Sequence, residues 1–349
     1  MNSSRLNLPP HSRRAFVAML AAVPAAYKSP RETGQFYFVE DRASIQSLAR
    51  NARQIPMFSP AWYAFDREGR LEETIGPVTA GLVKQHRLKT VPLVVNKGFD
   101  AAIAHTVIGD VDRRREAVKA LAAAAHRHGY AGYELDFESF RASDRDAYVS
   151  FAVDLARVMR KSGRTVSVSV AAPLLPTAQG SVYRPTEGAT LFDYELLGQE
   201  TDWLSFMAYD EHTQPDAPGP IASAPWVEAC LAHLTALVPA RKLKLGVPFY
   251  HRRWSGRGVQ EGSFDEAALL AEGYGIPLKV HPTEREISVR FKGQQGEEQI
   301  WMHNAASLKV RLELVQRLGL AGFAAWRLGQ EDPAFWTLVG GAAGQGVRS

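Results

Sequence analysis

The sequence predicts an α/β protein built as a (β/α)8 TIM barrel with a small α+β insertion after strand seven. Three observations support this prediction: eight short apolar runs typical of buried strands, helix-period patterns between most of them, and one gap too long for a loop. Strands that alternate with helices pair in parallel through right-handed crossovers, and eight such units close into a barrel. A doubly wound open sheet is the rival fold, but no Gly-x-Gly-x-x-Gly follows the first strand.

The expected strands are short runs of mostly apolar, β-branched or aromatic residues. They are Phe36–Val39, Pro56–Trp62, Thr90–Val95, Gly132–Phe137, Thr165–Ala171, Trp203–Met207, Lys244–Pro248 and Gly322–Trp326. The expected helices carry apolar residues three and four positions apart. They are Ala43–Arg53, Val78–His86, Val111–His128, Asp144–Lys161, Pro225–Val238 and Ala305–Leu318.

The long gap follows the seventh expected strand. About 55 residues separate Pro248 from the helix near Asn304, whereas ordinary strand-to-helix loops have about 2–6. The gap contains a helix-like stretch, Phe264–Ala271, and two alternating stretches, Ile287–Phe291 and Gln299–Met302. We therefore expect an α+β insertion over 251–302 within a barrel over 33–345. Because loops after barrel strands rise from the face that holds active sites, the insertion should wall a cleft.

Composition narrows the class of protein. The chain has 349 residues, 46% hydrophobic and 22% charged, which is typical of a globular protein. Its net charge is +4, but residues 1–31 carry five basic residues and no acidic one, so 4 − 5 = −1 remains for the rest. A nearly neutral body argues against nucleic acid as a partner. The single cysteine, Cys230, cannot form an intrachain disulfide, and no Cys/His cluster has zinc-site spacing. We expect a monomer without a cofactor.

Residues 1–26 have the layout of an export signal. Arg13 and Arg14 precede an apolar run, Ala15–Ala26, that contains small residues around Pro24. The adjacent arginines after Ser12 resemble a twin-arginine signal, which predicts an exported protein, periplasmic or extracellular after cleavage. The alternative is a disordered or amphipathic N-terminal helix of a cytoplasmic protein. A run of this length is too short to span a bilayer, which takes about 20 residues, so no transmembrane segment is expected.

The most informative stretch is Ala131–Glu138, which reads Ala-Gly-Tyr-Glu-Leu-Asp-Phe-Glu. Side chains of a strand alternate between its faces, so Glu134, Asp136 and Glu138 share one face and the intervening apolar residues the other. The apolar face fits the layer between barrel and helices, which directs the three acids into the barrel. Carboxylates about 6–7 Å apart in poor solvent repel one another, so not all stay ionised. A protonated carboxyl group at the open rim, where Glu138 lies, suits general acid catalysis.

Two other interpretations of this strand remain open at this point. An edge strand with a solvated polar face would show the same alternation. A divalent metal site would also use carboxylates, although no second acidic cluster or histidine pair is placed to complete its shell.

Gly132-x-Glu134-x-Asp136-x-Glu138 resembles the D-G-x-D-x-D-x-E signature of family 18 glycoside hydrolases, the chitinase-like (β/α)8 enzymes. Three later strand ends match the family in order. Met207–Asp210 resembles M-x-Y-D, Gly246–Tyr250 resembles G-x-P-x-Y, and Trp326 stands where the family places the tryptophan beneath the sugar. The similarity spans about residues 35–340 and is greatest to the branch of bacterial spore-cortex and cell-wall N-acetylglucosaminidases.

This resemblance implies a retaining, substrate-assisted glycosidase that cleaves glycans containing β-linked N-acetylglucosamine, either chitooligosaccharides or peptidoglycan. Glu138 would protonate the glycosidic oxygen and later activate water, while Asp136 would hold the acetamido group that attacks the anomeric carbon. Tyr209 would donate a hydrogen bond to that group, and Asp210 would position the distorted sugar. Glu134 would tune Asp136 from beneath.

The resemblance also implies a sugar-binding platform at the rim. Trp326 would face the apolar side of the reacting sugar, with Tyr250 and Met207 beside it. No metal ligand is expected.

The chain departs from the signature at two positions, where Ala131 and Glu134 replace aspartates. Two alternative functions stay open, and the departures motivate the first. One is a catalytically weak or inactive glycan-binding protein on the same barrel. The other is a metal hydrolase that uses Asp136, Glu138 and Asp210.

Overall fold

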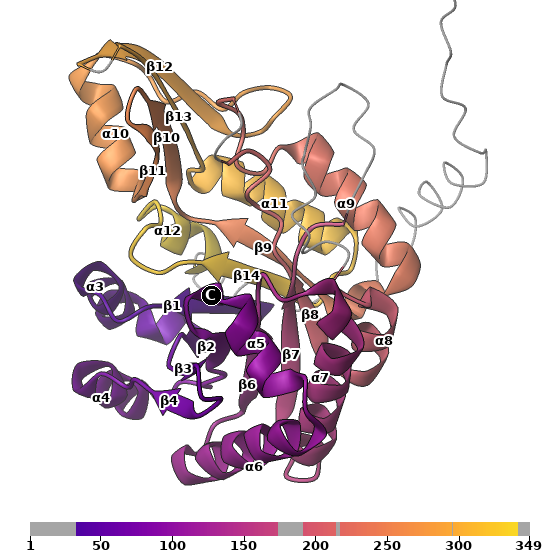
Figure 1. Cartoon of the computed structure of the whole chain (residues 1–349). Coiled ribbons are helices and arrows are strands. Elements are labelled where there is room, and N and C mark those ends of the chain that lie inside the picture. The colour runs from indigo at the N-terminus through magenta and orange to yellow at the C-terminus, as the bar shows by residue number, and fades with distance from the viewer. Residues whose placement is uncertain (1–32, 174–190, 214–216, 295, 341–349) are drawn as a thin grey trace, which may run out of the picture.

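The computed structural model describes residues 33–173, 191–213, 217–294 and 296–340. Its main feature is a ten-stranded sheet in the order β2-β1-β14-β9-β8-β7-β6-β5-β3-β4 (Figure 1). The strands are β1 (Gly34–Phe38), β2 (Met57–Pro60), β3 (Tyr63–Phe65), β4 (Leu71–Glu73), β5 (Leu93–Asn96), β6 (Gly132–Asp136), β7 (Thr165–Val170), β8 (Trp203–Phe206), β9 (Leu243–Pro248) and β14 (Gly322–Trp326). The expected export signal at 1–26 lies outside the described residues.

The sheet closes into the expected barrel. All its pairings are parallel except that of β3 with β4. Strand β2, at one end of the order, meets the segment that leads into β5, where Phe58 forms a parallel bridge with Thr90. The Phe58 amide donates to the Lys89 carbonyl at 2.9 Å, and the Val91 amide donates to the Phe58 carbonyl at 2.8 Å.

Helices surround the barrel (Figure 1). They are α3 (Arg42–Asn51), α4 (Pro77–His86), α5 (Ala101–Ile108), α6 (Val111–His128), α7 (Arg145–Arg160), α8 (Tyr194–Glu200), α9 (Ala224–Leu237), α11 (Ala305–Arg317) and α12 (Phe335–Gly340). Their ends follow local chemistry. The Asp110 side chain caps the amides of the first turn of α6, and Gly129 ends that helix with φ 70°, a conformation that glycine adopts without strain.

The segment after β9 forms a second, four-stranded antiparallel sheet in the order β11-β10-β13-β12. Its elements are β10 (His251–Ser255), β11 (Gly258–Gly262), α10 (Phe264–Gly273), β12 (Ile287–Gly293) and β13 (Gly296–Met302). It has its own small core around Val289 and Ile300. It projects from the barrel on the side of β9 (Figure 1).

Several elements were not predicted from the sequence. The β3–β4 hairpin follows directly after β2, where a single strand to Trp62 was expected, and the insertion contains β10 and β11 in addition to the two expected strands. Helices α5, α8 and α12 were also missed. These elements have three to eight residues, too few for a periodic pattern to emerge.

Among the described residues, no helix is both long enough and apolar enough to cross a membrane.

Candidate active site

The acidic face of β6 points into the barrel, as the alternation predicted. Tyr133, Leu135 and Phe137 are fully buried in the large core between barrel and helices. Glu134 lies on the opposite face and contacts Tyr37 of β1 across the barrel. The edge-strand interpretation is therefore wrong, because β6 pairs with β5 on one side and β7 on the other.

Glu134 is the lowest acid of this face and is completely buried. Its carboxylate accepts four hydrogen bonds: from Tyr37 at 2.5 Å, Ser169 at 2.9 Å, Ser167 at 3.0 Å and the amide of Gln35. The donors come from β1 and β7 and satisfy both carboxylate oxygens. A buried carboxyl group needs hydrogen-bond partners of this kind, because unpaired polar atoms are costly away from water. The glutamate at this position is thus accommodated within the barrel.

A buried lysine lies behind this network. Lys244 of β9 donates to the Gln35 side-chain carbonyl at 2.7 Å, and its ammonium group lies 4.0 Å from the centre of the Trp203 ring. Burial lowers the pKa of Lys244 to about 7, although the attraction of Glu134 opposes this shift. Gln35 therefore bridges a lysine and a carboxylate on the floor of the barrel.

The two upper acids are compensated less well. Burial raises the pKa of Asp136 well above its ordinary value, and the neighbouring charges of Glu138 and Glu134 add to the shift. Burial also raises the pKa of Glu138 to about 7, with a further contribution from Asp210. Both carboxyl groups thus hold a proton at higher pH than free side chains do, as a general acid requires.

Tyr209 and Asp210 follow the end of β8 and meet the acids of β6. The charges of Asp136 and Glu138 act on the Tyr209 hydroxyl, whose pKa burial raises well above its ordinary value. The ring of Tyr209 passes Gly246 of β9 so closely that a β-carbon there would lie 2.9 Å from it. This glycine of the G-x-P-x-Y motif therefore provides the space for the tyrosine.

Asp210 is held by two side chains of the β9–β10 segment. The Tyr250 hydroxyl and the Arg252 guanidinium, at 2.7 Å, both donate to the same carboxylate oxygen. Arg252 also pairs with Glu261 at 2.6 Å, although its own side chain is only 4% exposed. Asp210 has φ 66°, a left-handed conformation that is uncommon outside glycine. Its place beside β6 is thus fixed by contacts from another strand.

The expected sugar platform lies on the same rim. Trp326 at the end of β14 is partly exposed and, like Tyr209, packs against a cluster that includes Tyr250. Its ring centre lies 5.7 Å from that of Tyr37, which links it to the Glu134 network. Met207 at the end of β8 is half-buried, and its amide donates to the carbonyl of Val170 at 2.9 Å.

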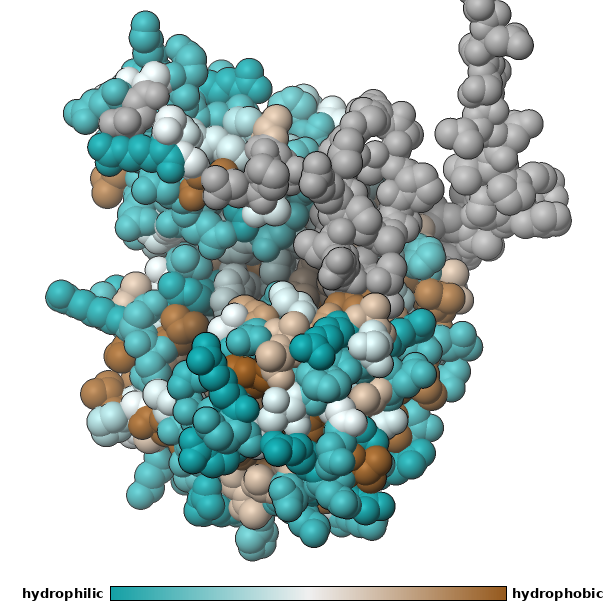
Figure 2. Space-filling model, in the orientation of Figure 1, coloured by the Kyte–Doolittle hydropathy of each residue, from teal (hydrophilic) through white to brown (hydrophobic). Residues whose placement is uncertain are grey.

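The structure thus brings Glu134, Asp136 and Glu138 together with the Tyr209–Asp210 pair, and Trp326 and Tyr209 pack against the same cluster around Tyr250. The insertion adds aromatic residues to this cluster through Trp254 and Trp301. The space-filling view shows the surface hollowed between the insertion and the barrel (Figure 2).

Four residues around the site were not predicted to take part: Gln35, Lys244, Asn96 and Arg252. Lys244 interrupts an otherwise apolar strand, and that interruption is a signal the sequence offered. Arg252, an isolated arginine beside a loop in the sequence, is a buried partner of two acids. Gln35 and Asn96 gave no signal, because their partners are distant in sequence.

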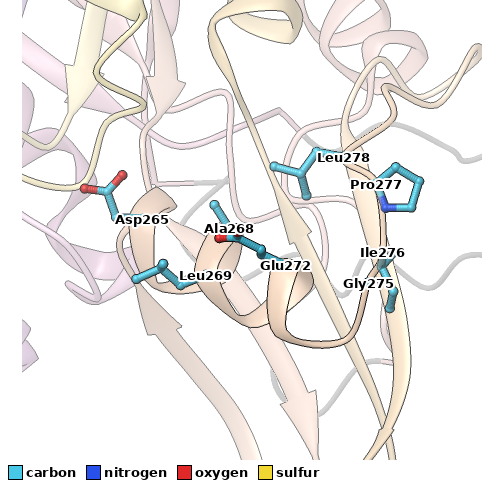
Figure 3. A pocket seen from close by; sticks show the side chains of 8 residues that line it. All are labelled: Asp265, Ala268, Leu269, Glu272, Gly275, Ile276, Pro277 and Leu278. Atoms are coloured by element: carbon cyan, nitrogen blue, oxygen red, sulfur yellow. The ribbon is translucent and has the colours of Figure 1, made fainter.

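A second hollow lies away from these residues, along α10 of the insertion (Figure 3). Asp265, Leu269 and Glu272 line it from the helix, and the segment 275–278 lines it from the other side. None of the acids of β6 borders it. Within the described ranges, no group of three or more His, Cys, Asp or Glu side chains could hold a metal ion.

Comparisons with known proteins show the family of this chain. The model of the family "Glycosyl hydrolases family 18" matches residues 79–331. An uncharacterized glycosylase of Bacillus subtilis, YvbX, is 23% identical over 87% of this chain and 89% of its own length. The cortical fragment-lytic enzyme of the same organism is 21% identical over 90% of this chain and 75% of its own length.

Solved structures show the same fold. A chitinase from Chromobacterium violaceum superposes with a TM-score of 0.80 at 25% identity, covering 90% of this chain and 99% of that one. The spore cortex-lytic enzyme SleL of Bacillus megaterium superposes with a TM-score of 0.79 at 19% identity, covering 91% and 75%. With its family model matched over most of the barrel, the chain belongs to glycosyl hydrolase family 18 and is a glycosidase.

Proposed function

We propose that this protein is a retaining, substrate-assisted glycosidase that cleaves glycans containing β-linked N-acetylglucosamine. The observation that carries the proposal is the pairing of two proton-holding acids, Asp136 and Glu138, with Tyr209 and Asp210 at the mouth of the barrel. The names of the relatives support the substrate class, because they include chitinases and enzymes that act on the spore cortex.

The chemistry follows from these positions. Glu138 gives its proton to the glycosidic oxygen as the bond to the anomeric carbon breaks. The acetamido oxygen of the same sugar attacks that carbon and forms an oxazolinium ion, so no carboxylate of the protein acts as nucleophile. Asp136 accepts a hydrogen bond from the acetamido N–H and stabilises the positive charge. Glu138, now ionised, takes a proton from water as it opens the ring, and two inversions give net retention.

Tyr209 and Asp210 orient the sugar in this scheme. The phenolic hydroxyl of Tyr209 donates to the acetamido group, and its raised pKa keeps it a donor. Asp210 binds the distorted ring while Tyr250 and Arg252 hold its carboxylate. Trp326 supplies the apolar face beneath the sugar, with Tyr250 and Met207 beside it.

The alternative of an inactive glycan-binding protein was suggested by Glu134 in place of an aspartate. The four hydrogen bonds around Glu134 argue against it, because the longer side chain fits a complete set of donors. Glu138 is also retained, and a binding protein gains nothing from an acid whose pKa is raised to about 7.

Matched substrates test the proposal. Purified protein is given chitooligosaccharides, cello-oligosaccharides of equal length and peptidoglycan, and the anomer first released is identified by NMR. We expect cleavage only where the acetamido group is present, with retention of configuration. Equal cleavage of cello-oligosaccharides would refute the acetamido mechanism. Tight binding without turnover at any pH would favour the binding protein. Chitooligosaccharides and peptidoglycan in separate arms identify the glycan.

Export and a monomeric state belong to the same proposal. Residues 1–26 would direct the protein out of the cytoplasm, toward such polymers.

A further inference from the structure

Asn96, the last residue of β5, is a fully buried polar residue beside the catalytic strand. Its side-chain oxygen accepts a hydrogen bond from the backbone amide of Glu138 at 3.0 Å, and its side-chain nitrogen donates to the Glu138 carbonyl at 3.0 Å. The same nitrogen donates to the Asp100 carbonyl at 3.1 Å. One amide side chain thus holds both backbone groups of the proposed general acid.

The position of Asn96 explains why this contact exists. The β5–β6 pairing ends with Val95 opposite Asp136, and β6 stops there. Glu138 therefore lies beyond the regular ladder, and Ser139 after it turns with φ 55°. Buried backbone groups that lose their ladder partners need others. Asn96 is next after Val95, and its side chain replaces the missing ladder bonds.

This contact bears on catalysis because the Glu138 carboxyl group must reach the glycosidic oxygen. Displacement of a catalytic group by about 1 Å can cost about 100-fold in rate. We propose that Asn96 is a positioning residue that fixes the backbone of Glu138 and thereby aims its carboxyl group at the leaving oxygen. This inference rests on the proposed function. Asn96 itself does not touch the substrate in this arrangement.

The test compares Asn96→Ala with the wild type on two leaving groups. One substrate is a chitooligosaccharide, whose sugar leaving group needs a proton, and the other is its 2,4-dinitrophenyl glycoside, whose leaving group departs without one. We expect kcat for the oligosaccharide to fall about 10- to 100-fold with KM changed less than about threefold. The first-turnover release of dinitrophenol should fall less than about threefold.

Asn304→Ala is the matched control. Asn304 caps α11 through its side chain, and its loss removes hydrogen bonds of the same kind elsewhere. We expect Asn304→Ala to have a lower melting temperature than the wild type. Its rates on the two substrates should change by the same factor. Asn96→Asp is the second variant, for use if Asn96→Ala folds poorly. It keeps the acceptor for the Glu138 amide and loses the donor, so its kcat for the oligosaccharide should be partly retained. Its added charge should move the alkaline limit of activity to higher pH.

The outcomes separate this inference from the function. A wild-type rate in a folded Asn96→Ala variant, or equal losses on both leaving groups, would overturn the positioning role. If the wild type cleaves no amino-sugar glycan, the proposed function fails first. Titration of the labelled Glu138 carboxyl group by NMR then decides the inference. A pKa that falls toward its ordinary value in Asn96→Ala supports the contact, and an unchanged pKa refutes it.

Discussion

Two groups of buried carboxylates in this molecule have opposite chemistry. The acids of β6 lie inside the barrel, and burial raises the pKa of both Asp136 and Glu138. The second group lies where the insertion meets the barrel, around the fully buried Glu286, whose pKa is lowered despite its burial. Asp136 and Glu286 are both buried and Glu138 is half-buried, and these acids differ in their partners.

Glu286 is surrounded by backbone donors, a histidine and an arginine. It accepts the amides of Ile221 at 3.0 Å and Ala222 at 2.5 Å, and His303 lies 3.5 Å away. Arg311 donates to the Ala222 carbonyl and adds positive charge. Burial alone would raise the pKa of Glu286, but the hydrogen bonds and positive charges of these partners lower it by more. Asp136 and Glu138 have no cation among the causes of their shifts. Incomplete compensation, and not burial, distinguishes the acids that we place in the active site.

The largest expected effect comes from Glu138→Gln. The amide cannot give a proton, so hydrolysis of chitooligosaccharides should fall at least about 100-fold. Folding should not suffer, because the neutral side chain avoids the cost of burying a charge. The raised pKa of Glu138 means that its stabilising neutral form is lost as pH rises through about 7. The melting temperature of the variant should therefore exceed that of the wild type by a margin that grows between about pH 4.5 and about pH 7 and stays constant above it. Wild-type turnover would remove Glu138 from the acid role.

Glu286→Gln should produce the converse result. Loss of the charge leaves His303 and Arg311 without their shared partner, and breaking a buried ion pair costs about 3–5 kcal/mol. Urea unfolding measures this loss. Activity should fall less than in Glu138→Gln, since Glu286 is connected to the site only indirectly, through the loop that carries Ile221. The control is Glu284→Gln, a neighbour outside the buried cluster. A fully stable Glu286→Gln variant would contradict the comparison.

The placement of the β6 acids could be predicted from the sequence, whereas the burial of Glu286 could not. The inward face of β6 follows from the two-residue alternation, because local chain geometry alone decides which side Glu134 and Asp136 occupy. Glu286 directly precedes β12, and no local sequence pattern predicts that it is buried. Its partners Ala222 and Arg311 are tens of residues away. Pairings of that kind depend on how the insertion docks against α11, which periodicity does not encode.

The same reasoning explains what was missed within the site. Arg252 is buried because Asp210, from another strand, neutralises it, and an isolated arginine beside a loop resembles a solvated one. The barrel strands themselves were predicted at nearly their observed positions, since each apolar run reflects burial on both faces. Long-range polar contacts therefore mark the limit of prediction from this sequence.

Stability at acid pH should separate the two groups further. The lowered pKa of Glu286 means that its contribution to folding is present above its ordinary value of 4.5 and disappears as pH falls through the folded value. The difference in unfolding free energy between wild type and Glu286→Gln should thus be constant at neutral pH and shrink below about pH 4.5. Wild type and Glu138→Gln should converge on the same acid side, because the Glu138 carboxyl group is neutral there. A series of urea unfolding curves between pH 3 and pH 8 is the measurement. A difference for Glu286→Gln that grows toward acid would show that its charge does not stabilise the fold.

The smallest expected effect concerns the lysine on the barrel floor. Lys244 is connected to Glu134 through the Gln35 bridge, and Glu134 and Lys89 are the charges that act on it. Lys244→Met removes the positive charge that Lys244 carries below its own pKa of about 7, so the acids above should keep their protons to slightly higher pH. We expect the alkaline limb of kcat/KM to rise by on the order of 0.3 pH unit, since the charge acts at long range.

The control for this shift is Lys242→Met, two residues earlier. Lys242 donates to backbone carbonyls of Gly198 at 2.7 Å and Thr201 at 2.8 Å, away from the acids. Its loss should lower stability and leave the pH profile unchanged. If Lys244→Met also left the profile unchanged, the floor of the barrel would be electrostatically separate from Glu138. The raised pKa of Glu138 would then depend on burial and Asp210 alone.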